Sequence, residues 1–122
     1  MINITTFIFQ QLSGTPSIAT QAKQIKPVVA EEGKWDPALI YTRIAEHRKG
    51  IARIGIYQIS AWSEQLWKAE ALIDEVIKHF SGLKIPPIRH CSLMSLDQSY
   101  YSEKRMHGVH ATLRFKLVDE NF

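Results

Sequence analysis

The histidines are the residues of this sequence with the most evident capacity for chemistry. There are five of them, and His107 and His110 form the closest pair. Imidazoles bind a metal when several converge on one point, but positions 107 and 110 point to opposite faces of a strand because strand side chains alternate. The sequence also lacks an HExxH motif and a cysteine partner at zinc spacing. We therefore predict no metal site.

A carboxylate pair and a lone cysteine are the other candidates for chemistry. Glu70 and Asp74 stand at i, i+4 on an expected helix, a spacing that brings two carboxyl groups together. They sit among lysines at ion-pair spacing, which indicates a solvated surface. Cys91 follows His90 in an expected strand, where neighbours face opposite ways, and is typical of a small buried hydrophobe. We predict no catalytic residue and no cofactor, so the protein is not expected to be an enzyme.

Composition indicates an ordinary globular protein. The chain has 122 residues, which suits a single domain over 1–122. Apolar residues make up 45% and charged residues 22%, with a net charge of +3. The single cysteine excludes an internal disulfide and fits a reducing compartment. No apolar run approaches the ~20 residues that span a bilayer, and the N-terminal residues do not form a signal peptide, so we expect no membrane partner.

Helical periodicity appears in two places. Residues 4–12 carry apolar side chains on one face, with Asn3 as the expected N-cap, and Thr15-Pro16 opens a further single turn. The main helix is predicted over Ser63–Phe80, with Ser63 as its N-cap. Its apolar stripe consists of Leu66, Ala69, Ile73, Val76, Ile77 and Phe80.

The remaining elements read as strands. They are an edge piece over Ile25–Ala30, strands over Ala38–Glu46, Ile51–Trp62 and Ile88–Leu96, a turn region over Asp97–Met106, and a final strand over 107–118. The order is α-β-β-α-β-β. This order predicts an α+β fold: a mostly antiparallel sheet of about four strands with two helices on one face, a short edge piece and an extended hairpin arm.

The strand over Ile51–Trp62 is apolar on both faces, although a strand with one solvated face should alternate. We expect Ile54 and Ile56 to face the main helix. Tyr57 and Ile59 then point away from it and require a cover. Trp67 flanks the helix stripe and is either a core residue or an interface residue, as tryptophan is common in both.

Positive charge gathers at the tip of the hairpin. The residues concerned are Arg43, His47, Arg48, Lys49 and Arg53. A basic sheet with aromatic residues can bind single-stranded nucleic acid, but the RNP signature is missing. A nucleic-acid-binding α+β module therefore remains an alternative to a solvated basic turn.

The ordered set of segments resembles the tail completion, or tail terminator, family of long-tailed bacteriophages and prophages. The similarity extends over nearly the whole chain and lies in the order of the segments, not in a single motif. The segments are IKPVVA from Ile25, PALIYTRI over Pro37–Ile44, RIGIYQISAW over Arg53–Trp62, AEALIDEVIKHF up to Phe80, LDQSYY from Leu96, and HGVHATLRFKL from His107.

This resemblance implies a structural virion protein. Members form a ring, generally a hexamer, at the head-proximal end of the tail tube, where they stop tube polymerisation and join the head. Expected partners are further copies of the chain, the tail tube protein and head–tail connector proteins. DNA can pass through the lumen without sequence-specific binding. The expected location is the host cytoplasm during assembly and then the virion tail.

A ring requires heterologous contacts between subunits. We expect Arg53, Tyr57, Ile59 and Trp67 at the subunit interface, with Arg53 paired to an acidic residue across it, and Arg48 and Lys49 at the basic hairpin tip. The alternative within the same class is another head–tail connector or a stopper protein.

Overall fold

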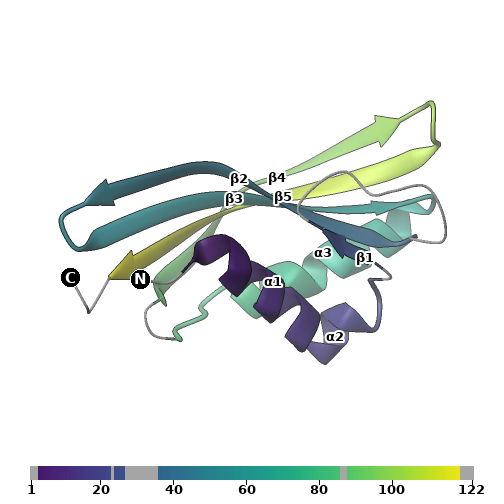
Figure 1. Ribbon diagram of the computed structural model, residues 1–122. Helices are drawn as coiled ribbons and strands as arrows, with labels where there is room; N and C mark the ends of the chain where they lie inside the picture. The colour runs from purple at the N-terminus through teal and green to yellow at the C-terminus, as the bar shows by residue number, and fades with distance from the viewer. Residues whose placement is uncertain (1–2, 23, 27–35, 86–87, 119–122) are drawn as a thin grey trace.

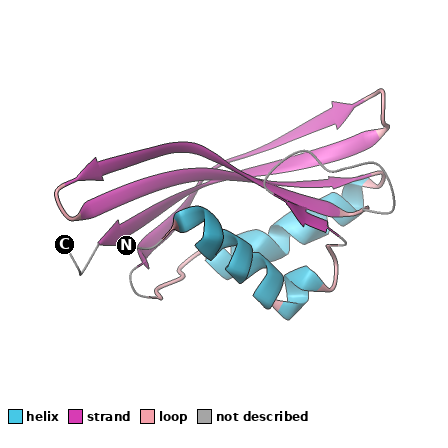
Figure 2. Ribbon diagram, viewed as in Figure 1, coloured by secondary structure: helices cyan, strands magenta, loops and turns pink. Residues whose placement is uncertain are grey.

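A computed structural model describes residues 3–22, 24–26, 36–85 and 88–118, and confirms the predicted α+β class. A five-stranded sheet of order β1-β2-β3-β5-β4 carries the helices on one face (Figures 1 and 2). Its strands are β1 (Gln24–Lys26), β2 (Ala38–Lys49), β3 (Ala52–Ser63), β4 (Ile88–Tyr101) and β5 (Met106–Val118). The helices are α1 (Ile4–Gly14), α2 (Pro16–Ala19) and α3 (Leu66–Phe80). β1 pairs with β2 in parallel, and the other neighbours are antiparallel.

The first helix begins where the sequence predicts. The Asn3 side chain accepts a hydrogen bond from the Thr6 amide at 3.0 Å, which satisfies an amide that the helix leaves unpaired. The predicted apolar face is buried, namely Ile4, Phe7, Ile8 and Leu12. The single turn opened by Pro16 follows as α2. The edge piece is confirmed at β1, whereas its continuation lies outside the described residues.

The main helix starts later than predicted. Ser63 is not its N-cap but the last residue of β3, where it is fully buried and accepts a hydrogen bond from the Gln65 amide at 3.1 Å. That bond closes the turn between strand and helix, and Gln65 occupies the N-cap position. Leu72 joins the buried face, while Leu66 and Ile77 are only partly buried.

The two faces of β3 are the reverse of the prediction. Tyr57 and Ile59 face the helices and are 1% and 0% exposed, whereas Ile54 and Ile56 lie half-buried on the opposite face. Both faces are apolar, so the period of two does not show which one the helices cover. Tyr57 instead packs edge-on against Phe115 of β5, with ring centroids 6.1 Å apart, inside the core.

Two long hairpins extend from the helix-covered body in opposite directions (Figure 1). The β2–β3 hairpin is the predicted arm, and each of its strands has 12 residues. The β4–β5 hairpin is longer than predicted, because β4 continues to Tyr101 where a turn was predicted from Asp97. Residues Ser95–Tyr101 pair in regular register with β5 up to Met106. The turn itself is confined to 102–105, with a positive φ at Arg105.

Candidate assembly surfaces

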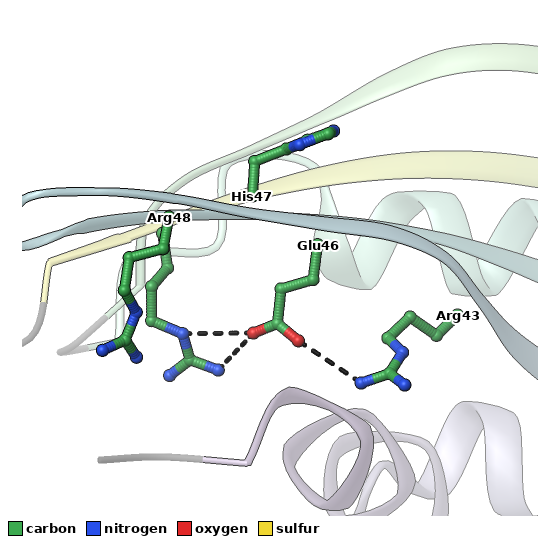
Figure 3. A pocket seen from close by; sticks show the side chains of 5 residues that line it. Arg43, Glu46, His47 and Arg48 are labelled. Carbon is green, nitrogen blue, oxygen red and sulfur yellow. Dashed lines mark hydrogen bonds and ion pairs between the residues drawn. The ribbon is translucent and has the colours of Figure 1, made fainter.

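The tip of the β2–β3 hairpin holds a network of arginines around one carboxylate. Gly50 has a φ of 61°, which a tight hairpin turn requires at this position. Arg43, Glu46 and Arg48 of β2 extend toward the side of α1 and line a hollow of about 600 Å³ (Figure 3). The Glu46 carboxylate accepts hydrogen bonds from Arg53 Nε at 3.1 Å and from Arg43 Nη1 at 3.4 Å.

Arg53 is a structural residue of the hairpin. It is 5% exposed, and Glu46 of the same chain is its carboxylate partner. A guanidinium this deeply buried is costly unless an anion compensates it, and Glu46 supplies that anion. The start of α1, at Asn3 and Ile4, lines the adjoining hollow with Arg53. Pairing of Arg53 with an acidic residue of another subunit stays a prediction.

The other predicted interface residues differ strongly in how exposed they are to solvent. Tyr57 and Ile59 belong to the core, but the Trp67 side chain, in the first turn of α3, is 66% exposed. Its Nε1 donates to Gln65 Oε1 at 2.6 Å, and Lys68 Nζ lies 5.7 Å from the ring centroid. A large aromatic face that is held in place but left in solvent is a typical feature of a protein interface.

Exposed apolar side chains follow β4 from Leu93 to Tyr101, a surface that the sequence did not predict. Its exposed large hydrophobic residues are Leu93, Met94, Leu96, Tyr100 and Tyr101. Isolated exposed apolar residues are unremarkable, but a cluster along one strand marks an interaction surface. The available sequence signal was the scarcity of charge, since Asp97 is the only charged residue between Cys91 and Tyr101.

The sheet face opposite the helices carries a group of polar side chains centred on His110. His110 Nδ1 lies 2.7 Å from Ser60 Oγ, and its Nε2 lies 2.7 Å from Ser99 Oγ, so this ring links three neighbouring strands. His107 lies on the other face, where its ring contacts the Tyr100 ring in a tilted arrangement at a centroid distance of 4.8 Å. The prediction that the two histidines face opposite ways is confirmed, and their contacts are those of structural residues.

The described residues contain no cluster of three or more histidine, cysteine or acidic side chains that could hold a metal. Cys91 is buried, and burial raises the pKa of its thiol to about 12. A thiol with that pKa is almost entirely protonated at neutral pH and is a poor nucleophile. Glu70 and Asp74 are exposed on α3. No described helix is both long and apolar enough to cross a membrane.

Two histidines make the stability of the fold sensitive to pH. Burial lowers the pKa of His79, whose Nε2 lies 2.8 Å from Gln11 Oε1, and burial also lowers the pKa of His110 despite the opposing charge of Asp97. Below the ordinary histidine pKa of 6.5, the unfolded chain therefore binds more protons than the folded chain. This contribution to stability is present above pH 6.5 and is lost as the pH falls through the folded pKa values.

We therefore expect the melting temperature to fall between about pH 7.5 and about pH 5, and to fall less in a variant with His79→Gln and His110→Gln. Scanning calorimetry of both proteins across this range measures the difference. Because carboxylates titrate at the acidic end in both proteins alike, only the difference between the two curves reports on the histidines. If the melting temperatures of the two proteins fall equally with pH, the pH dependence does not come from His79 and His110.

Comparison with known proteins defines the class of fold. No family model matches the sequence, and no curated protein matches it either. Among solved structures, the chain is similar to a chain described as "Virion of native gene transfer agent (GTA) particle", with a TM-score of 0.69 and 12% identity. The similarity covers 91% of this chain and 91% of that one. At this identity the match establishes a shared α+β fold that includes nearly all of both chains.

Proposed function

We propose that this protein is a structural component of a phage-like virion, and specifically the tail terminator. As a single domain over 1–122, it forms a ring, generally a hexamer, on the head-proximal end of the tail tube. There it stops polymerisation and joins the tail to the head. The observation that carries the proposal is the near-complete fold match to a chain of the gene transfer agent virion.

The distribution of exposed apolar surface supports an assembly role. In the isolated chain, exposed apolar side chains lie along Leu93–Tyr101 of β4, at Trp67 on α3, and at Ile44 and Ile51 on the β2–β3 arm. These patches lie on different parts of the molecule, which suits the head-to-tail contacts of a ring, where one patch meets a different patch on the next subunit. The expected partners are the tail tube protein and the head–tail connector proteins.

A second role fits the same fold. A connector or stopper protein at the head–tail joint would also form a ring and present apolar patches. The two roles differ in what happens when the protein is missing. Without a terminator, tubes grow to irregular lengths. Without a connector or stopper, tubes of normal length fail to join filled heads.

The experiment that separates these roles is deletion of the gene from the producing genome, followed by electron microscopy of the lysate. Tails of variable and excessive length support the terminator role. Uniform tails that are detached from filled heads support the connector role instead. Normal joined particles would overturn both.

Trp67 provides a test of the assembly surface. We expect Trp67→Ala to weaken ring formation with little change in fold, because the indole is mostly exposed. Analytical ultracentrifugation measures the oligomer and circular dichroism measures the fold. Glu70→Ala is the matched control, since Glu70 is exposed one turn further along the same helix. Equal sedimentation of both variants and the unmodified protein would remove Trp67 from the interface.

A further inference from the structure

The sheet has two strand edges that the described part of the chain leaves largely unpaired. At one side, β1 covers β2 only along Ala38–Ile40, so from Tyr41 to Lys49 no described strand lies along the edge of β2 that faces away from β3. At the other side, β4 is the last described strand, and no described strand lies along the outer edge of its stretch Ser95–Tyr101. Such an edge presents unpaired N–H and C=O groups that can bind a further strand.

The stretch Ser95–Tyr101 of the β4 edge lacks most of the devices that usually prevent such pairing. Edge strands are commonly protected by charges, prolines, bulges or short length. β4 has 14 residues and contains no proline. Its register shifts lie before Ser95, so the stretch Ser95–Tyr101 is regular. Asp97 is the only charged residue in that stretch, and the apolar side chains of Leu96, Tyr100 and Tyr101 are exposed beside it.

The β2 edge, in contrast, is rich in charged residues. Its register shifts between Arg43 and Ala45, and the stretch Ala45–Lys49 beyond the shift is regular. This stretch carries Glu46, His47, Arg48 and Lys49. Two β2 edges placed side by side would bring their basic residues together, and like charges on adjacent strands are destabilising. A strand with little charge and an acidic residue, such as β4 with Asp97, avoids that repulsion.

The strand directions also match. Each step across the sheet from β2 to β3, β5 and β4 is antiparallel, so β4 runs antiparallel to β2. When a second copy lies beside the first in the same orientation, its β4 runs antiparallel to the first copy's β2. Across one sheet Ser95 is level with Thr42, and β1 already pairs with Ala38–Ile40. The second copy is therefore shifted along the strand direction until Ser95 lies opposite His47, beyond the part of β2 that β1 covers. This contact is heterologous, because one edge meets the other, and its repetition closes a ring if the rotation per copy allows.

We propose that the partner of the β4 edge is the β2 edge of a second copy of this chain, so that the subunits of the ring share one continuous antiparallel sheet. This inference rests on the proposed ring and specifies its interface. Backbone hydrogen bonds between the strands hold the copies together, as in other cases of strand addition. The exposed apolar residues of β4 are then covered by the neighbouring hairpin arm.

Cysteine cross-linking between two differently labelled chains tests this arrangement. Ser95→Cys places a thiol on β4, and His47→Cys places one on β2. Both positions lie on the face opposite the helices, because their paired residues are Thr112 and Ile54. Directly opposed residues of neighbouring strands have Cβ atoms about 4.5–5.5 Å apart, within reach of a short bismaleimide linker. The native Cys91 is buried and stays unreactive, and the unmodified protein controls for it.

We expect the mixture of the two variants to give a covalent heterodimer, and each variant alone to give little dimer. The heterodimer should be lost when Leu96→Lys is added to the Ser95→Cys chain, because it replaces an apolar contact by a charge of the same sign as the β2 edge. A homodimer of the Ser95→Cys chain as the main product would show that two β4 edges pair with each other, and this isologous contact would overturn the proposal. Rings that form without a heterodimer would overturn it and leave the terminator function standing. A protein that stays monomeric at all concentrations also overturns it, and the deletion experiment then decides the function separately.

Discussion

Tyr57→Ala is expected to destabilise the isolated chain by about 3–5 kcal/mol, the typical cost of truncating a buried aromatic side chain. The Tyr57 ring is 1% exposed and packs edge-on against Phe115. Its hydroxyl lies 2.8 Å from Thr5 Oγ1 on α1. Truncation removes the aromatic contact, leaves a cavity between sheet and helix, and leaves Thr5 without this partner. Urea denaturation followed by circular dichroism measures the free energy of unfolding.

Tyr57→Phe is the matched control for this prediction. It keeps the ring and removes only the hydroxyl, so the expected loss is about 0.5–1.5 kcal/mol, the net contribution of one hydrogen bond. The comparison also tests the corrected orientation of β3. If Tyr57→Ala leaves stability nearly unchanged but prevents ring formation, Tyr57 belongs to a subunit interface, as the sequence first indicated, and the described core is wrong at this residue.

Ile73→Ala is expected to cost about 2–5 kcal/mol, from lost transfer free energy and from the cavity left behind. Ile73 is fully buried at the centre of α3, on the face that packs against β3 and β5. Alanine is also a good helix former, so the loss reports on packing and not on helix propensity.

Lys78→Ala, in the last turn of α3, serves as the control for Ile73→Ala. Lys78 is exposed, and surface substitutions away from special features usually change stability by no more than about 0.5 kcal/mol. Thermal or urea unfolding of both variants provides the comparison. A loss below about 1 kcal/mol for Ile73→Ala would mean that α3 does not pack as described.

Two of the predicted interface residues, on the central strand β3, and the β4 surface show where sequence patterns fail. Tyr57 and Ile59 were assigned to a neighbour because their strand is apolar on both sides. The structure uses them as core and leaves Ile54 and Ile56 half-buried. The stretch from Asp97 to Met106 was assigned to a turn region. As far as Tyr101 it forms a strand because its backbone pairs with β5, although its side chains are exposed.

The sequence by itself determined the elements whose signals are local. The Asn3 cap and the apolar face of α1, the tight turn at Gly50, and the alternation along β5 all depend on residues close together in the chain, so periodicity and turn chemistry identify them. Only the tertiary structure decided which face of β3 the helices cover, which carboxylate compensates Arg53, and how far β4 extends. Each of these depends on residues brought together from different strands and helices. A pattern along one segment does not specify its partner, because the free energy of burial and pairing depends on what lies opposite.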